Sequence, residues 1–466
     1  MDYFSSVSAI TKLHIDRAVD AFFERNGFDP TARTVVLIPG GLGSRLRRAR
    51  HPFDAHAPEV DPRLSTVWVD CGLFLAEDAK KLFIDGDGLD TSTRIIIADG
   101  EVDFVIDPYD DAVRALRAVG MNVLLIGWDW RRKVPLAVEN IAYALDRLDQ
   151  RAKAEGHGAL LPRITLVGHS MGGMVAKLLL TDRPDLAKQL AGMISVGSPF
   201  YGYFGQLIRF FEGAKYFNEL YGARTVAQVT SSMPGLYELM PIDLAQYQDV
   251  GATLGLSHYP VTDLETGAVV DAHAATTQPR YPPWVRREQF ARAIQVRQRL
   301  AAPLPKDVAA RVHHIRGSDP ESTVSAVQWN AHLPPDYDPA KSRSPLVHHA
   351  DAGDHTIPLW SARLAQTPDP RVYDFTDAQH AFLMEDRRII AKVAEIAGQT
   401  PRPASEIGAI VGAAPMIASS ADAIAHLQAQ RRGDAPQTEI KKLGDRLHLL
   451  GLPGPVARRI MQEAAM

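Results

Sequence analysis

The sequence predicts an α/β fold in which a mostly parallel central sheet is flanked by helices. Short runs of strand-forming apolar residues recur along the chain, and most are followed by a stretch with helical periodicity. The strands are expected at 34–38, 122–126, 163–167, 192–196 and 312–315, and helices at 109–119 and 174–180. Because continuous apolar strands that alternate with helices are typical of sheets buried on both faces, a parallel sheet is favoured.

Two segments interrupt this alternation. Residues 44 to about 100 contain an Arg-rich turn, prolines and a hydrophobic patch around Trp68. Residues 199 to about 305 carry many aromatic residues, then polar loops and a helical pattern near 286–300. Insertions into an α/β core commonly form caps or lids over an active site, so both are expected to do so.

The two ends of the chain are predicted to be helical. Residues 1–30 form an N-terminal helix whose apolar face carries Ile10, Leu13, Val19 and Phe22. The α/β domain is expected over 31–398. After Gly398 the residues QTPRPAS indicate a linker, and the remainder of 399–466 is expected as a tail of short helices broken by prolines.

Composition excludes several classes of protein. The 46% of hydrophobic residues is too high for a disordered chain, and the net charge of −4 argues against a nucleic-acid binder. Cys71 is the single cysteine, so an intrachain disulfide and cysteine-based zinc clusters are impossible. The first residues lack the pattern of a secretory signal, and the weakly polar stretch 407–418 is too short to span a bilayer. A cytoplasmic protein is expected.

The strongest functional motif is Gly168-His-Ser-Met-Gly172, a G-x-S-x-G sequence between strand formers and helix formers. Such a sharp strand-to-helix turn places a serine in a strained backbone conformation, with its hydroxyl exposed at the carboxyl edge of the sheet. The glycines two residues to either side allow strand and helix to approach closely. Ser170 is therefore the expected nucleophile, the alternative being an incidental glycine-rich turn.

A serine hydroxyl needs a base to remove its proton, and the base needs an orienting carboxylate. Both should follow the serine in the chain. His380, in a loop before a helix expected near 385, is the predicted base, and Asp354, in a turn after a strand-like stretch, is the predicted acid. Asp351 is the main alternative to Asp354, and the alternatives to His380 are His348, His349 and His355.

Around these residues the sequence resembles the lecithin:cholesterol acyltransferase family of α/β-hydrolases, which includes phospholipase A2/transacylases and bacterial relatives. Six motifs over residues 34–390 carry the resemblance: VLIPGGLGSRL from Val36, TVWVD from Thr66, GWDWR from Gly127, SPFYG from Ser198, SMPGLYELMP from Ser232 and GDHTIP from Gly353. Trp128 stands where the family motif has tyrosine, and His355 stands where "GDGTVP" has its second glycine. The resemblance implies an α/β-hydrolase fold.

The resemblance also implies roles for individual residues. Ser170, Asp354 and His380 match the family's nucleophile, acid and base. Its oxyanion hole uses two backbone N–H groups, which correspond here to those of Met171 and Gly41. The alternative for the glycines is that they only form a tight turn, since glycine adopts positive φ angles without strain. Candidate substrate-binding residues are Trp68, Asp129 and Trp130. For Asp129, a buried ion pair with Arg131 that holds a loop is the alternative.

The leading functional hypothesis is a serine hydrolase or acyltransferase that acts on carboxylic esters, with lipid or phospholipid acyl esters as substrates. The alternatives are a carboxylesterase for a non-lipid ester and a catalytically silent scaffold. Neither a cofactor nor a metal is expected, since His313 and His314 point to opposite faces of a strand and no carboxylate cluster accompanies them. The expected partners are a small-molecule or lipid ester and, through the lid, a membrane surface. No nucleic-acid partner is expected, and the sequence predicts no oligomeric state.

Overall fold

The computed structural model describes residues 3–24, 27–49, 66–68, 82–85, 95–98, 109–213, 222–241, 261–270, 281–329 and 336–398. The predicted C-terminal tail (399–466) and most of the predicted lid at 44–100 lie outside the described residues.

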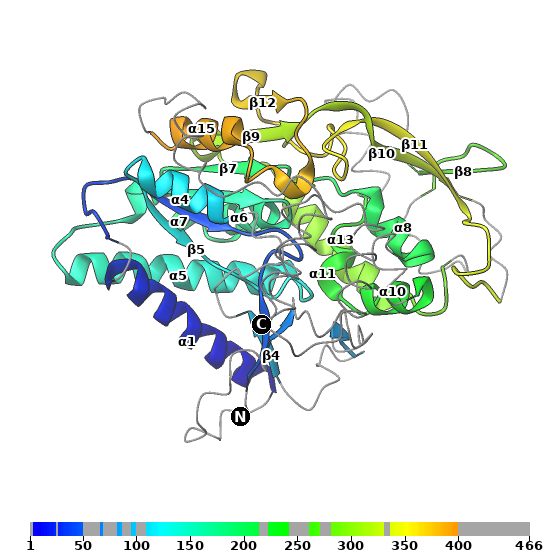
Figure 1. The fold of residues 1–466 in the computed structure, drawn as a ribbon, viewed down its shortest axis with the longest axis horizontal. Coiled ribbons are helices and arrows are strands. Elements are labelled where there is room, and N and C mark those ends of the chain that lie inside the picture. The colour runs from blue at the N-terminus through cyan, green and yellow to red at the C-terminus, as the bar shows by residue number, and fades with distance from the viewer. Residues whose placement is uncertain are drawn as a thin grey trace, which may run out of the picture.

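A six-stranded parallel sheet forms the centre of the described fold (Figure 1). Its strands in spatial order are β12 (Val372–Phe375), β9 (Val312–Gly317), β7 (Gly192–Val196), β6 (Ile164–His169), β1 (Thr34–Ile38) and β5 (Asn122–Leu125). Every neighbouring pair is parallel. The predicted mostly parallel central sheet is therefore confirmed.

Helices cover both faces of this sheet. Helices α4 (Asp110–Ala118) and α15 (Arg387–Ile396) pack on one face, and α5 (Val134–Ala154), α6 (Met171–Asp182) and α7 (Pro184–Gln189) lie on the other. Successive side chains of a strand point to opposite faces. In β1, Val35 and Leu37 accordingly pack in the core beside α4, and Val36 and Ile38 pack in the core beside α5 and α6.

Helix α1 (Tyr3–Glu24) lies against α5 and β4 (Ile95–Ala98). Its buried face carries Ile15, Val19 and Phe22, which recur at helical spacing. The prediction that Leu13 belongs to this face was wrong, because its side chain is 50% exposed. The helix docks through the row that begins at Thr11 and continues with Ile15, and Leu13 lies outside that row.

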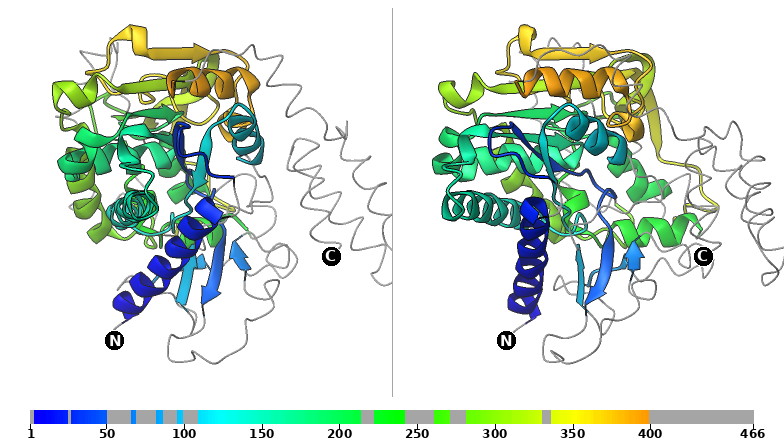
Figure 2. Two further views of the ribbon diagram at one scale, coloured as in Figure 1. Left: turned by 90° about the vertical axis from the view of Figure 1, so that its left-hand side faces the viewer. Right: turned by 60° about the vertical axis from the view of Figure 1, so that its left-hand side comes forward.

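Two small sheets lie outside the central sheet. In the first, β2 (Leu46–Ala49) pairs antiparallel with β3 (Thr66–Trp68) and with β4, next to α1 (Figure 2). In the second, β10 (Asp319–Trp329) lies between β11 (Leu346–Gly353) and β8 (Val261–Asp263), and only β8 falls within the insertion predicted at 199–305. The helices of that insertion are α8 (Phe204–Glu212), α10 (Ala223–Thr230), α11 (Pro234–Tyr237) and α13 (Arg287–Ala301), and α14 (Lys306–Ala309) follows it.

Aromatic residues form the core between the second insertion and β10. Phe210 and Phe211 of α8 are fully buried and pack against Tyr237, Phe290 and Trp329. These phenylalanines therefore serve as core residues. Among the described helices, none is long and apolar enough to cross a membrane.

Candidate active site

Ser170 lies in a sharp turn between the carboxyl end of β6 and the first residue of α6. Its backbone angles, φ 52° and ψ −125°, are rarely adopted by a residue with a side chain. The turn is held from the neighbouring strand, since the Ser170 N–H donates to the Val196 carbonyl at 2.9 Å. The strained conformation expected of the G-x-S-x-G motif is thus present.

The glycines of the motif are required by close packing. A Cβ on Gly168 would lie 2.5 Å from the Gly173 backbone, and a Cβ on Gly172 would lie 2.1 Å from the Ile38 carbonyl oxygen. Both distances are far below a normal carbon contact, so only glycine lets β6, α6 and β1 converge at this point.

His380 and Asp354 reach Ser170 in an unbroken hydrogen-bonded series. His380 Nε2 lies 2.9 Å from Ser170 Oγ, and His380 Nδ1 lies 2.7 Å from Asp354 Oδ2. A carboxylate can only accept, so Nδ1 carries the proton and Nε2 presents its lone pair to the serine hydroxyl. This is the tautomer that a general base requires.

The backbone around Asp354 holds this arrangement in place. Asp354 Oδ1 accepts the N–H groups of Thr356 at 3.1 Å and Ile357 at 2.6 Å. The His380 N–H donates to the Asp354 carbonyl at 2.8 Å, so acid and base are joined through both main chain and side chain. The Asp354 side chain is 1% exposed and that of His380 is 13% exposed.

Two glycines that follow neighbouring strands make room for the acid and the base. A Cβ on Gly197, after β7, would lie 2.9 Å from Asp354 Oδ2 and 3.2 Å from His380 Nδ1. A Cβ on Gly317, at the end of β9, would lie 2.5 Å from Asp354 Cβ. Neither glycine was predicted from the sequence, although the position of Gly197 directly after an expected strand was a usable signal.

The glycine-rich turn after β1 packs directly on the serine turn. A Cβ on Gly40 would lie 2.7 Å from Ser170 Cβ, and one on Gly41 would lie 2.7 Å from Met171 Sδ. Met171 begins α6, so its N–H lies in the first turn, where a helix offers no carbonyl four residues back. Among the described residues, neither the Gly41 nor the Met171 N–H has a protein acceptor.

Trp128 supports the same turn from the carboxyl side of β5. Its indole N–H donates to the Pro39 carbonyl at 2.9 Å, and its backbone N–H donates to Ser44 Oγ at 3.0 Å. Its side chain is 1% exposed. The tryptophan at this motif position therefore supplies a donor that fixes the turn before Gly41.

His169 and Tyr109 form a second polar link that the sequence analysis missed. The Gly40 N–H donates to Tyr109 Oη at 2.9 Å, Tyr109 Oη lies 2.8 Å from His169 Nδ1, and His169 Nε2 lies 3.0 Å from the His380 carbonyl. Burial, with a smaller contribution from His380, lowers the pKa of His169 to about 3. His169 is therefore neutral, with its proton on Nε2 facing the carbonyl.

The alternative triad residues lie elsewhere. His355 pairs with Asp319 at 2.9 Å, and His348 lies 3.3 Å from Glu212. Asp351 is exposed on β11 and accepts the N–H of Ala352. Ser170 is thus brought together with His380 and Asp354 rather than with these residues.

Of the candidate substrate-binding residues, Asp129 lies in a network of ion pairs with two arginines. Asp129 accepts both ends of the Arg131 guanidinium, at 2.9 and 2.7 Å, and Arg132 Nε at 3.1 Å. Burial opposes ionisation of Asp129, but the charges and hydrogen bonds of the two arginines outweigh it and lower its pKa. Trp130 is 1% exposed. Trp68 is the last residue of β3, and its side chain lies outside the described part of the structure.

The described histidines and carboxylates do not gather into a metal-binding group of three or more. His313 stacks on Tyr373 with 6.0 Å between ring centroids, and His314 is buried between Ser195 Oγ at 2.5 Å and Thr367 Oγ1 at 3.0 Å.

The sheet and the serine turn define the class as an α/β-hydrolase fold. Residues 133–218, which include the serine turn, match the family model described as PGAP1-like alpha/beta domain. A comparison with curated proteins finds no match.

Several solved structures are similar to this chain, among them the two that follow. The Tle4–Tli4 complex has a TM-score of 0.48 and 14% sequence identity, covering 83% of this chain and 100% of that one. The mature form of the Bacillus licheniformis lipase BlEst2 has a TM-score of 0.34 and 10% identity, covering 76% of this chain and 88% of that one.

Proposed function

We propose that this protein is a serine hydrolase or O-acyltransferase that acts on lipid acyl esters. The observation that carries the proposal is the series Ser170–His380–Asp354, with its 2.9 Å and 2.7 Å contacts at the carboxyl edge of the sheet. The six motifs that resemble the lecithin:cholesterol acyltransferase family support a lipid substrate.

In the acylation step, Ser170 Oγ bonds to the ester carbonyl carbon while His380 Nε2 takes the hydroxyl proton. The carbonyl oxygen becomes an oxyanion and accepts the N–H groups of Gly41 and Met171. The tetrahedral intermediate then breaks its bond to the alkoxy oxygen. The departing alcohol takes the proton from His380 Nε2, and an acyl-serine remains.

In the second step, water or an alcohol gives a proton to His380 Nε2 and attacks the acyl carbon. The bond to Ser170 Oγ breaks, and the serine takes the proton back. Water yields a free acid, whereas an alcohol yields a new ester, so the acceptor that the site admits decides between hydrolysis and acyl transfer.

The electrostatics around His380 favour the imidazolium that forms during both steps. Asp354 faces Nδ1 in a buried position, where a charge interacts more strongly than in water. The nearby His169 ring, 5.1 Å away between centroids, is neutral because burial lowers its pKa to about 3. It therefore adds no positive charge beside the imidazolium.

The test compares wild type with Ser170→Ala in fluorophosphonate labelling and in the hydrolysis of p-nitrophenyl esters of increasing chain length. Labelling and turnover are expected in wild type alone, with faster turnover of long acyl chains. Long-chain turnover would then be followed with phospholipid vesicles, with and without an added alcohol, to separate hydrolysis from transfer.

Other outcomes would redirect the proposal. Turnover restricted to short chains would favour a carboxylesterase for a non-lipid ester. Folded wild-type protein that takes no label would contradict serine catalysis and favour the scaffold alternative.

A further inference from the structure

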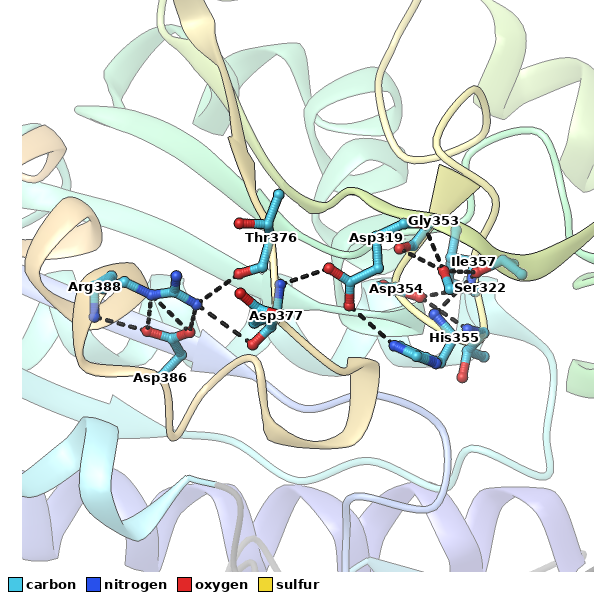
Figure 3. Close-up of polar contacts among 12 residues, drawn as sticks. Asp319, Ser322, Gly353, Asp354, His355, Ile357, Thr376, Asp377, Asp386 and Arg388 are labelled. Atoms are coloured by element: carbon cyan, nitrogen blue, oxygen red, sulfur yellow. Dashed lines mark hydrogen bonds and ion pairs between the residues drawn. The ribbon is translucent and has the colours of Figure 1, made fainter. Parts of the chain in front are cut away.

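One carboxylate joins the loop of the proposed acid to the loop of the proposed base. Asp319 stands at the start of β10, two residues after β9 ends, between these loops (Figure 3). Its Oδ2 lies 2.9 Å from His355 Nε2, and its Oδ1 accepts the Asp377 N–H at 2.5 Å. His355 directly follows Asp354 in the chain, and Asp377 precedes His380 by three residues.

Both residues that Asp319 holds have an unusual backbone. His355 has φ 69° and Asp377 has φ 54°, in the left-handed region that favours glycine. Residues with side chains remain in this region only where surrounding contacts hold them there. The two strained positions lie close in the chain to Asp354 and His380, which must stay within hydrogen-bond distance of each other. Restraining His355 and Asp377 therefore helps to keep this distance.

Other contacts restrain each loop separately. From β10, Thr323 Oγ1 accepts the His355 N–H at 2.9 Å, and Ser322 Oγ donates to the Gly353 carbonyl at 2.9 Å. On the side of the base, Arg388 donates to the carbonyls of Thr376 at 2.9 Å and Asp377 at 3.4 Å.

In this group, Asp319 contacts both loops through its side chain, and that side chain is 15% exposed. The ionisable groups around it are His355, whose side chain is 45% exposed, Asp377, and Arg388, which is paired with Asp386. Hydrogen bonds to a carboxylate are stronger than those between neutral groups, so Asp319 restrains both loops although the two bonds lie near the surface.

We propose that Asp319 is a positioning residue that fixes the Asp354 loop against the His380 loop. The inference rests on the proposed function, because it assigns Asp319 to the acyl-transfer reaction of that site. Asp319 contacts neither Ser170 nor the proposed oxyanion donors, so its effect falls on the orientation of His380. Loss of this restraint lowers the rate of the chemical steps and leaves substrate binding unchanged.

The experiment measures kcat, KM, the rate of fluorophosphonate labelling and Tm for Asp319→Ala and Asp319→Asn. Alanine is expected to lower kcat and the labelling rate together by about 10- to 100-fold, with KM within about twofold, since small misplacements of catalytic groups have effects of this size. Asparagine keeps an oxygen that accepts the Asp377 N–H and an amide that donates to His355, so it is expected to restore most of kcat.

Asp149→Ala is the matched control. Asp149 is also a buried carboxylate that holds a loop, because it accepts the N–H groups of Leu160 at 2.7 Å and Leu161 at 3.2 Å. That loop leads into the amino end of β6, whereas Ser170 follows the carboxyl end of the same strand. It should lower Tm without changing kcat. A folded Asp319→Ala that behaves like this control would overturn the proposal.

His355→Gly provides a second variant in case Asp319→Ala does not fold. Glycine adopts φ 69° without strain, so the fold is retained while one of the two bonds to Asp319 is lost. A kcat reduced at unchanged KM is expected, and an unchanged kcat would contradict the positioning role. Wild type that takes no label would instead contradict the proposed function, so the two failures are distinguishable.

Discussion

Nε2 of His169 lies 3.0 Å from the backbone carbonyl oxygen of His380 and donates its proton to it. The residue that precedes the nucleophile thereby holds the loop of the proposed base. Through Tyr109 Oη, 2.8 Å from His169 Nδ1, the same ring is connected to the Gly40 N–H in the proposed oxyanion turn. Base and oxyanion turn are therefore linked behind Ser170 by a chain of buried hydrogen bonds.

Tyr109→Phe removes the middle of this chain. The Gly40 N–H and His169 Nδ1 would lose their hydrogen bond to the Tyr109 hydroxyl in a buried position, where an unsatisfied group costs about 1–3 kcal/mol. We expect a lower free energy of unfolding and a kcat that falls about tenfold, because both the oxyanion turn and the base loop relax. Urea unfolding and ester hydrolysis measure the two effects. A loss of stability with unchanged kcat would show that the chain supports the fold alone.

Gly197→Ala tests the space that β7 leaves for the acid and the base. The new Cβ would lie 2.9 Å from Asp354 Oδ2 and 2.6 Å from Leu383 Cδ1, and alanine is also strained at φ 58°. We expect kcat to fall about 100-fold because the acid–base pair must move. Gly267→Ala, at φ 66° with no atom within 4 Å of the added Cβ, controls for backbone strain and should retain activity.

Asp129→Ala separates a structural role from a substrate-binding role. The change leaves the fully buried guanidinium of Arg131 without its bidentate partner, and breaking a buried ion pair in this way costs about 3–5 kcal/mol. The exposed pair of Arg183 and Asp185 has the same spacing in sequence, and Asp185→Ala should change stability by less than about 1 kcal/mol. A raised KM in folded Asp129→Ala would favour the substrate-binding role.

Strands made of continuous apolar residues could be predicted from the sequence. The edge strand of the central sheet and the long strand of the second small sheet could not. The strands Thr34–Ile38 and Gly192–Val196 are fully or almost fully buried, which explains why nearly all their residues are apolar. The edge strand β12 (Val372–Phe375) is partly exposed and contains an aspartate, and β10 (Asp319–Trp329) begins with polar residues. Neither has the apolar pattern on which prediction depends.

The candidate site divides in the same way. Ser170, Asp354 and His380 were identified because a local motif and an order in the chain indicate them. Tyr109 and Asp319 act through contacts with residues 60 and 36 positions away, and no spacing in one sequence reports such contacts. His169 occupies a variable position of the G-x-S-x-G motif, so the motif does not indicate a role for it. Its role follows from its contacts with Tyr109 and with the His380 carbonyl.

Lys177 offers a test of stability against pH that is independent of the triad. Its ammonium group is buried on α6 and donates to the Arg299 carbonyl at 3.2 Å and the Ala302 carbonyl at 2.6 Å, at the end of α13. Burial lowers the pKa of Lys177 to about 8, and Asp182 opposes this only in part. The carbonyls therefore do not fully compensate for the loss of hydration.

Between pH 8 and 10.5 the unfolded chain still binds a proton that Lys177 has released in the folded chain, so the contribution of this residue to stability rises with pH. Below pH 8 both states are protonated and the full penalty of burying the charge is present. We expect the free energy of unfolding of wild type, minus that of Lys177→Met, to increase by about 3 kcal/mol across this interval, at 1.36 kcal/mol per pKa unit. Chemical denaturation at a series of pH values measures the difference. A difference that stays constant or decreases with pH would mean that Lys177 is not desolvated, and that α13 ends on a hydrated lysine.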